Sequence, residues 1–179
     1  MNRMLDVCPD CGKKHIDIAK PQYWETQTPG QCWKHSVNML NKYGVSGGNK
    51  TNVIIVATQL KEGSVDETEL TLRNVNIFEG INYMYNQLTY QKPIVVGVDR
   101  ENEQATYNSD FTTEHFILIV GYGCEDGKSF FRYFDPGSKE VSNGTNKNNK
   151  LYIENKFIKG NMPGENSKIY TIVQVRRNK

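Results

Sequence analysis

Apolar residues near the start of the chain recur at the spacing of a helix. Trp33, Val37 and Leu40 fall on one helical face directly after Cys32, and a polar stretch broken by proline and glycine precedes them. The pattern predicts a helix that begins close to Cys32 and ends near Tyr43.

A second helix is predicted over residues 77–90. Apolar residues recur there at helical spacing until Pro93, which forbids continuation, and Asn76 and Glu79 resemble a capping box. The earlier stretch 52–60 is rich in β-branched residues but precedes a glutamate-rich segment. Strand and helix both stay open for that stretch.

Farther along, the pattern changes to strands separated by turn signals. Residues 123–127 read as a turn between two antiparallel strands, and the asparagine- and glycine-rich stretch 137–150 reads as a mobile surface loop. Helices followed by an antiparallel sheet give an α+β order. The predicted strands cover residues 94–98, 116–122, 129–135, 151–157 and 169–175.

Composition and charge narrow the classes of function. The 179 residues carry 22 basic and 20 acidic side chains, a net charge of +2, with no basic stripe that would favour nucleic-acid binding. The first residues lack the apolar core of a Sec signal peptide, and no apolar run is long enough to span a membrane. We therefore expect a protein that is made in the cytoplasm without a Sec signal and has no membrane span.

The four cysteines are too few and too unevenly spaced for a secreted disulfide framework, although one pair could bridge. Cys8, Cys11 and His15 form a tight turn that could supply three ligands of a structural zinc site. A closed site needs a fourth ligand, so a terminal turn with reduced or locally paired cysteines is an equal alternative. Residues 1–19 are expected to form this terminal segment, and residues 20–179 a catalytic domain.

Cys32 is the strongest candidate for chemistry. The free N–H groups and dipole at a helix N-terminus favour a thiolate, which is the nucleophilic form of cysteine. His115 lies at the head of an apolar strand and could act as the base, and Asp135 ends the next strand, where it could orient the imidazole. Each residue alone has an ordinary explanation, as buried cysteine, core histidine or turn aspartate, but together they favour a triad.

A catalytic thiolate also needs donors for a developing oxyanion. The Cys32 backbone N–H could supply one, and the Gln27 amide could fold back across the bend before the helix to supply another. Gln31 is a competing choice, but a side chain adjacent to the nucleophile points away more easily. His35 is a weaker candidate base, since it lies three residues from Cys32 on the same helix.

The order Gln27, Cys32-Trp33, His115-Phe116 with the following Gly-Tyr-Gly, and Asp135 resembles the papain-like cysteine peptidase superfamily. It is closest to the compact bacterial branch of bacteriocin-leader peptidases. That resemblance implies a papain-like α+β fold, in which a helix bearing the cysteine packs on an antiparallel sheet bearing the histidine and aspartate. It also implies Gln27 in the oxyanion hole. The chain further resembles toxin domains of polymorphic or type VI secretion effectors in Bacteroidetes.

These features predict a cysteine hydrolase that cleaves an amide bond in a protein or a peptidoglycan peptide through a thioester. The toxin resemblance implies an antibacterial effector that a dedicated machine secretes into a target cell. It also implies a cognate immunity protein that plugs the cleft beside residues 137–150. A zinc-stabilised binding module without catalysis, and an acyl transferase that uses the same triad, are the alternatives.

Overall fold

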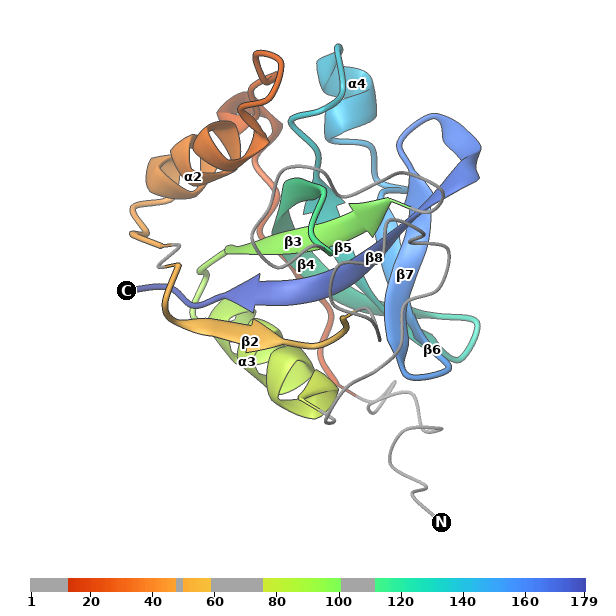
Figure 1. Cartoon of the computed structure of the whole chain (residues 1–179). Helices are drawn as coiled ribbons and strands as arrows, with labels where there is room; N and C mark the ends of the chain where they lie inside the picture. Colours follow the sequence, from red (N-terminus) through yellow and green to blue (C-terminus); the bar gives the residue numbers. More distant parts are fainter. Residues whose placement is uncertain (1–12, 48–49, 59–75, 101–111) are drawn as a thin grey trace.

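The computed structural model describes residues 13–47, 50–58, 76–100 and 112–179 of the chain. Within these residues, an eight-stranded antiparallel sheet is the main element, accompanied by short helices (Figure 1). The elements in chain order are β1 (Ile16–Asp17), η1 (Pro21–Tyr23), α2 (Cys32–Lys42), β2 (Val53–Ile55), α3 (Ile77–Thr89), β3 (Ile94–Arg100), β4 (His115–Glu125), β5 (Lys128–Phe134), α4 (Val141–Gly144), β6 (Lys150–Glu154), β7 (Phe157–Met162) and β8 (Glu165–Arg176).

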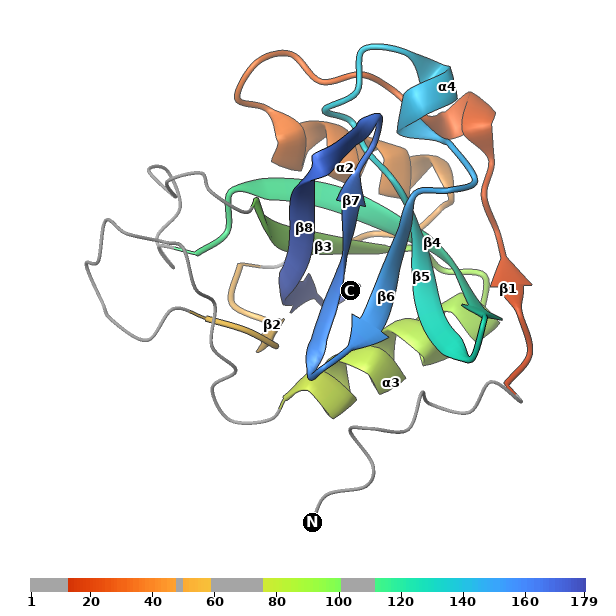
Figure 2. The same ribbon diagram turned by 90° about the vertical axis from the view of Figure 1, so that its right-hand side faces the viewer.

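The sheet closes on itself into a barrel. Its strands follow the order β4-β3-β8-β7-β6-β5, and the additional pairing of β4 with β5 joins the two ends of this path. Closure leaves every strand of the ring paired on both sides. The short strands β1 and β2 add to β4 and β8. Figure 2 shows the strands wrapping around the interior, with α3 beneath them.

The expected papain-like α+β fold, with a helix on a sheet, is therefore wrong. The sequence pattern predicted the hairpin around residues 123–127, which is confirmed as the pairing of β4 with β5, but it did not reveal the other pairings. Closure depends on β8 lying between β3 and β7, and these two strands are far apart in sequence. Helix α2 packs against β4 and β3, and α3 packs against β2, β4 and β8. Every residue of β3 from Ile94 to Asp99 is buried, because both faces of this strand are covered. A strand covered on both faces has a continuous apolar sequence, as residues 94–96 do.

The helices begin and end close to their predicted limits, but two local expectations are corrected. The predicted strand over residues 151–157 contains a hairpin turn at Asn155 and Lys156, both with positive φ, and so divides into β6 and β7. Asn76 makes no side-chain capping bond, although it is the N-cap of α3. The stretch 52–60 contains the strand β2 in its described part.

The stretch 137–150 is not the loop that its composition suggested. It contains the helical turn α4, and Thr145 and Asn149 are buried. The Thr145 hydroxyl donates to the carbonyl of Val141, and the Asn149 amide donates to the carbonyl of Asn143. These bonds hold the segment together, and bonds from Arg132 and Tyr133 of β5 to the carbonyls of Thr145 and Asn149 attach it to the barrel.

Candidate functional site

Cys32 opens helix α2, as the sequence predicted, and its thiol is partly buried and free. Two contacts dock the first turns of the helix onto the start of β4. The Ser36 hydroxyl donates to the Phe116 carbonyl at 3.0 Å, and the Trp33 and Phe116 rings meet edge to face with centroids 4.9 Å apart. Because Phe116 follows His115, these contacts bring the thiol to the imidazole.

His115 and Asp135 form a buried pair. Their exposed fractions are 1% and 2%, and His115 Nε2 lies 2.7 Å from Asp135 Oδ1. The hairpin explains the meeting, since Leu118 of β4 pairs with Phe134 of β5 and the chain beyond Phe134 therefore runs back past His115. The sequence placed these two side chains together correctly.

Asp135 is held by further donors. The Gly137 N–H donates to Oδ1 at 2.7 Å, and the Tyr170 hydroxyl donates to Oδ2 at 2.8 Å. The indole Nε1 of Trp24 donates to the Asp135 carbonyl at 2.8 Å. Donors on both oxygens fix the carboxylate and favour its charged form.

Electrostatics couple the three side chains. Burial disfavours the imidazolium, but the Asp135 carboxylate outweighs this cost and raises the pKa of His115 to about 9. Burial likewise raises the pKa of Asp135, yet the attraction of His115 dominates and the net pKa is lowered. The pair is therefore an imidazolium and a carboxylate at neutral pH.

The pKa of Cys32 is also lowered. Burial of the thiol opposes this shift, and the interaction with His115 and the backbone N–H groups of Phe116 and Trp33 outweigh it. Nε2 of His115 is engaged by Asp135, whereas the buried Nδ1 makes no regular hydrogen bond within the described residues. Nδ1 is thus the ring nitrogen available to exchange a proton with the thiol.

The backbone of Gln27 lies beside the segment that follows Asp135. Its backbone N–H donates to the Pro136 carbonyl at 2.7 Å, and the Thr26 hydroxyl donates to the Ser138 carbonyl at 2.7 Å. The segment that carries Gln27 is therefore held along the segment that follows Asp135. Gln27 Oε1 is buried and lacks a hydrogen-bond partner in the described structure. Gln31, the competing choice, is exposed and makes no capping bond.

His35 has a different environment from His115. Its Nδ1 lies 2.6 Å from Glu25 Oε1, and its Nε2 lies 3.3 Å from the backbone nitrogen of Thr28. Glu25 also accepts bonds from Asn38 and Lys42. This network fastens the segment before Cys32 to the outer turns of α2, which gives His35 a structural task.

Most of the residues of the predicted N-terminal zinc site lie outside the part of the chain that the structure describes. Cys8 and Cys11 lie outside the described residues, and Nε2 of His15 accepts a hydrogen bond from the Cys124 backbone at 3.2 Å. Among the residues that the structure describes, no group of three or more histidine, cysteine or acidic side chains could hold a metal ion. Cys124, which the sequence suggested was incidental, takes part in a disulfide.

Sequence reasoning missed Tyr170 and Trp24. Tyr170 lies in β8, and its ring stacks at a tilt over His115 with centroids 5.7 Å apart. No local signal marks this residue, because its position follows from barrel closure. Gly137 could have been found, since it ends the Asp-Pro-Gly turn sequence that begins at Asp135.

Comparison of the sequence with protein-family models, with curated proteins and with solved structures found no match. In the described parts of the chain, no helix is both long and apolar enough to cross a membrane.

Proposed function

We propose that this chain is a cysteine hydrolase that cleaves an amide bond through a thioester on Cys32. The observation that supports this proposal most strongly is the buried His115–Asp135 pair, whose Nε2 and Oδ1 atoms lie 2.7 Å apart. This pair lies beside the Cys32 thiol at the start of α2, whose pKa is lowered. A neighbouring imidazolium and a helix N-terminus are the two standard means of activating a thiol. The proposal rests on this chemistry and not on a fold.

In the first half of the reaction, the Cys32 thiolate attacks the carbonyl carbon of the substrate amide, and the carbonyl π electrons move to oxygen. The Cys32 backbone N–H and the Gln27 amide are the proposed donors to that oxyanion. As the tetrahedral species collapses, His115 gives the Nδ1 proton to the leaving nitrogen and the C–N bond breaks. The amine departs and the acyl group stays on sulfur as a thioester.

In the second half, neutral His115 takes a proton from water, and the resulting hydroxide attacks the thioester carbon. Collapse of this tetrahedral species expels the Cys32 thiolate and yields a carboxylic acid. Imidazolium and thiolate are thereby restored, ready for the next substrate. Asp135 stays ionised throughout, stabilises the imidazolium and holds the ring with Nδ1 toward the thiol.

The test is incubation of the purified protein with peptidoglycan and with a panel of unfolded proteins, followed by mass spectrometry of the products. Wild type should release new amine and carboxylate ends, and Cys32→Ala should release none. His15→Asn is the matched control for His115→Asn, because His15 binds the Cys124 backbone near the far end of β4 and should retain activity. Absence of any cleavage that depends on Cys32 would refute the proposal.

A biological role as an antibacterial effector is part of the same proposal and is supported by the toxin resemblance in the sequence. An amidase of this kind would harm a cell whose protein or peptidoglycan it reaches. Directed expression in the cytoplasm and in the periplasm of a bacterial host should therefore reduce growth for wild type and not for Cys32→Ala. A cognate immunity protein, co-expressed, should restore growth. Equal tolerance of both forms in both compartments would reject the effector role.

A further inference from the structure

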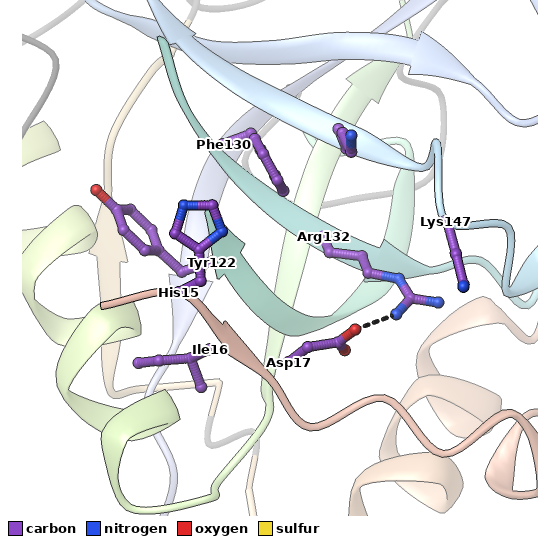
Figure 3. A pocket seen from close by; sticks show the side chains of 8 residues that line it. His15, Ile16, Asp17, Tyr122, Phe130, Arg132 and Lys147 are labelled. Carbon is purple, nitrogen blue, oxygen red and sulfur yellow. Dashed lines mark hydrogen bonds and ion pairs between the residues drawn. The ribbon is translucent and has the colours of Figure 1, made fainter. Parts of the chain in front are cut away.

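A recess lies on the barrel wall away from Cys32. It has a volume of about 290 Å³ and lies among β1, the far half of β4, β5 and the start of β6 (Figure 3). Tyr122 in its wall is seven residues along β4 from His115, which corresponds to roughly 20 Å of strand. The recess is therefore separate from the candidate active site. Its lining residues are His15, Ile16, Asp17, Tyr122, Phe130, Arg132, Lys147 and Lys150.

Arg132 provides a fixed cation in this recess. The residue is only 8% exposed, its Nη1 donates to Asp17 Oδ2 at 2.7 Å, and its Nη2 donates to the Thr145 carbonyl at 3.0 Å. Nε is buried and has no hydrogen-bond partner in the described structure. Asp17, the counter-ion, has a side chain 61% exposed. A buried guanidinium whose single carboxylate partner is largely solvated retains capacity for another anion.

Two lysines add positive charge. Lys150 Nζ lies 2.7 Å from Glu125 Oε2 and 4.6 Å from the centre of the Phe130 ring, so it is held in place. Lys147 is exposed and makes no ion pair or hydrogen bond with the described residues, and Figure 3 shows it at the same end of the recess as Arg132. Of the three basic groups in the lining, Arg132 pairs with Asp17 and Lys150 with Glu125, so Lys147 is the one without a carboxylate partner among the described residues.

The other end of the recess is aromatic. The Phe130 ring lines it, and a side chain at Gly123 would come within 2.5 Å of this ring, so glycine there allows the ring its position. The Tyr122 ring is buried and packs against Tyr85 and Phe131 instead. His15 is held by the Cys124 N–H. A pocket with Arg132 and Lys147 at one end and the Phe130 ring at the other suits a ligand that is charged at one end and apolar at the other.

We propose that this recess binds a small organic oxyanion, with its carboxylate or phosphate group at Lys147 and Arg132 and its apolar body against Phe130. The two oxyanions share the chemistry of accepting charge-assisted hydrogen bonds from guanidinium and ammonium groups. Such a site would operate whether or not Cys32 is a nucleophile.

Titration of the full chain with benzoate and with phenyl phosphate, followed by calorimetry and amide NMR, tests the site. At least one probe should bind saturably and shift the signals of residues 121–132 and 147, and the tighter probe identifies carboxylate or phosphate as the preferred group. Lys147→Gln should weaken binding about fivefold or more, the effect of removing one charge near a protein surface. Phe130→Leu should also weaken it.

Lys128→Gln is the matched control, because Lys128 is an exposed lysine that pairs with Glu154 and does not line the recess. The Lys128→Gln variant should bind each probe with the affinity of wild type. Benzamide, which has the shape of benzoate without the charge, should bind more weakly than benzoate. The inference fails if neither anion binds saturably, if benzamide equals both anions, or if Lys147→Gln binds as wild type does.

Discussion

His115 Nε2 and Asp135 Oδ1 lie 2.7 Å apart in the buried part of the site, where neither side chain is more than a few per cent exposed. An ion pair taken out of water is costly unless its remaining polar atoms are satisfied. Asp135 meets this condition through Gly137 and Tyr170, whereas His115 Nδ1 makes no regular hydrogen bond in the described structure. This asymmetry leaves Nδ1 available to exchange a proton with Cys32 and with the substrate.

Replacing Asp135 by Asn should abolish the elevation of the His115 pKa. Burial lowers this pKa, and the carboxylate is the main cause that raises it to about 9, so without Asp135 the pKa should fall well below that of wild type, with only Cys32 left to oppose burial. The imidazole NMR signals of His115 followed against pH measure this directly. We expect the amide cleavage rate to fall by about 10²-fold or more, as the loss of an orienting aspartate does elsewhere. An unchanged His115 titration would show that the pair is not electrostatically coupled.

Gly137→Ala should impair the site through steric contact. A Cβ at this position would lie 3.0 Å from Asp135 Oδ1 and 3.1 Å from His115 Nε2, tighter than ordinary contact, and the buried pair has little room to move. We expect at least a tenfold loss of turnover, since small displacements of catalytic groups are costly.

Ser138→Ala is the control for this change, because Ser138 takes part in hydrogen bonds with the described residues through its backbone alone. It should keep the turnover of wild type. Equal turnover in Gly137→Ala and Ser138→Ala would mean that the close approach of Gly137 is not needed for catalysis.

The disulfide of Cys124 predicts a difference in reactivity between two cysteines. Under non-reducing conditions iodoacetamide should label Cys32 and leave Cys124 unlabelled, and Cys124 should become reactive after reduction in denaturant. Reduction should also lower the free energy of unfolding by roughly 2–4 kcal/mol, the usual contribution of a native disulfide. Peptide mapping before and after reduction and a denaturant titration check both points. Labelling of Cys124 before reduction would contradict the structure.

The parts of the candidate site that depend on neighbouring residues in the sequence could be predicted. The parts that depend on closure of the barrel could not. The helix at Cys32 follows from a stretch of fourteen or so residues, and the meeting of His115 with Asp135 follows from one hairpin between consecutive strands. Tyr170 reaches Asp135 only because β8 inserts between β3 and β7. Pairing of strands distant in sequence depends on the whole fold, so neither the barrel nor this hydroxyl could be read from a pattern.

The rate of Cys32 alkylation as a function of pH tests the central claim most directly. Iodoacetamide reacts with the thiolate, so mass spectrometry of the Cys32 peptide reports the pKa of this thiol. We predict a midpoint below the ordinary 9.0 in wild type and in His35→Gln. In His115→Gln the midpoint should rise, because burial then acts with less opposition. A wild-type midpoint at or above 9.0, or the same midpoint in His115→Gln, would contradict the activation of Cys32 by His115.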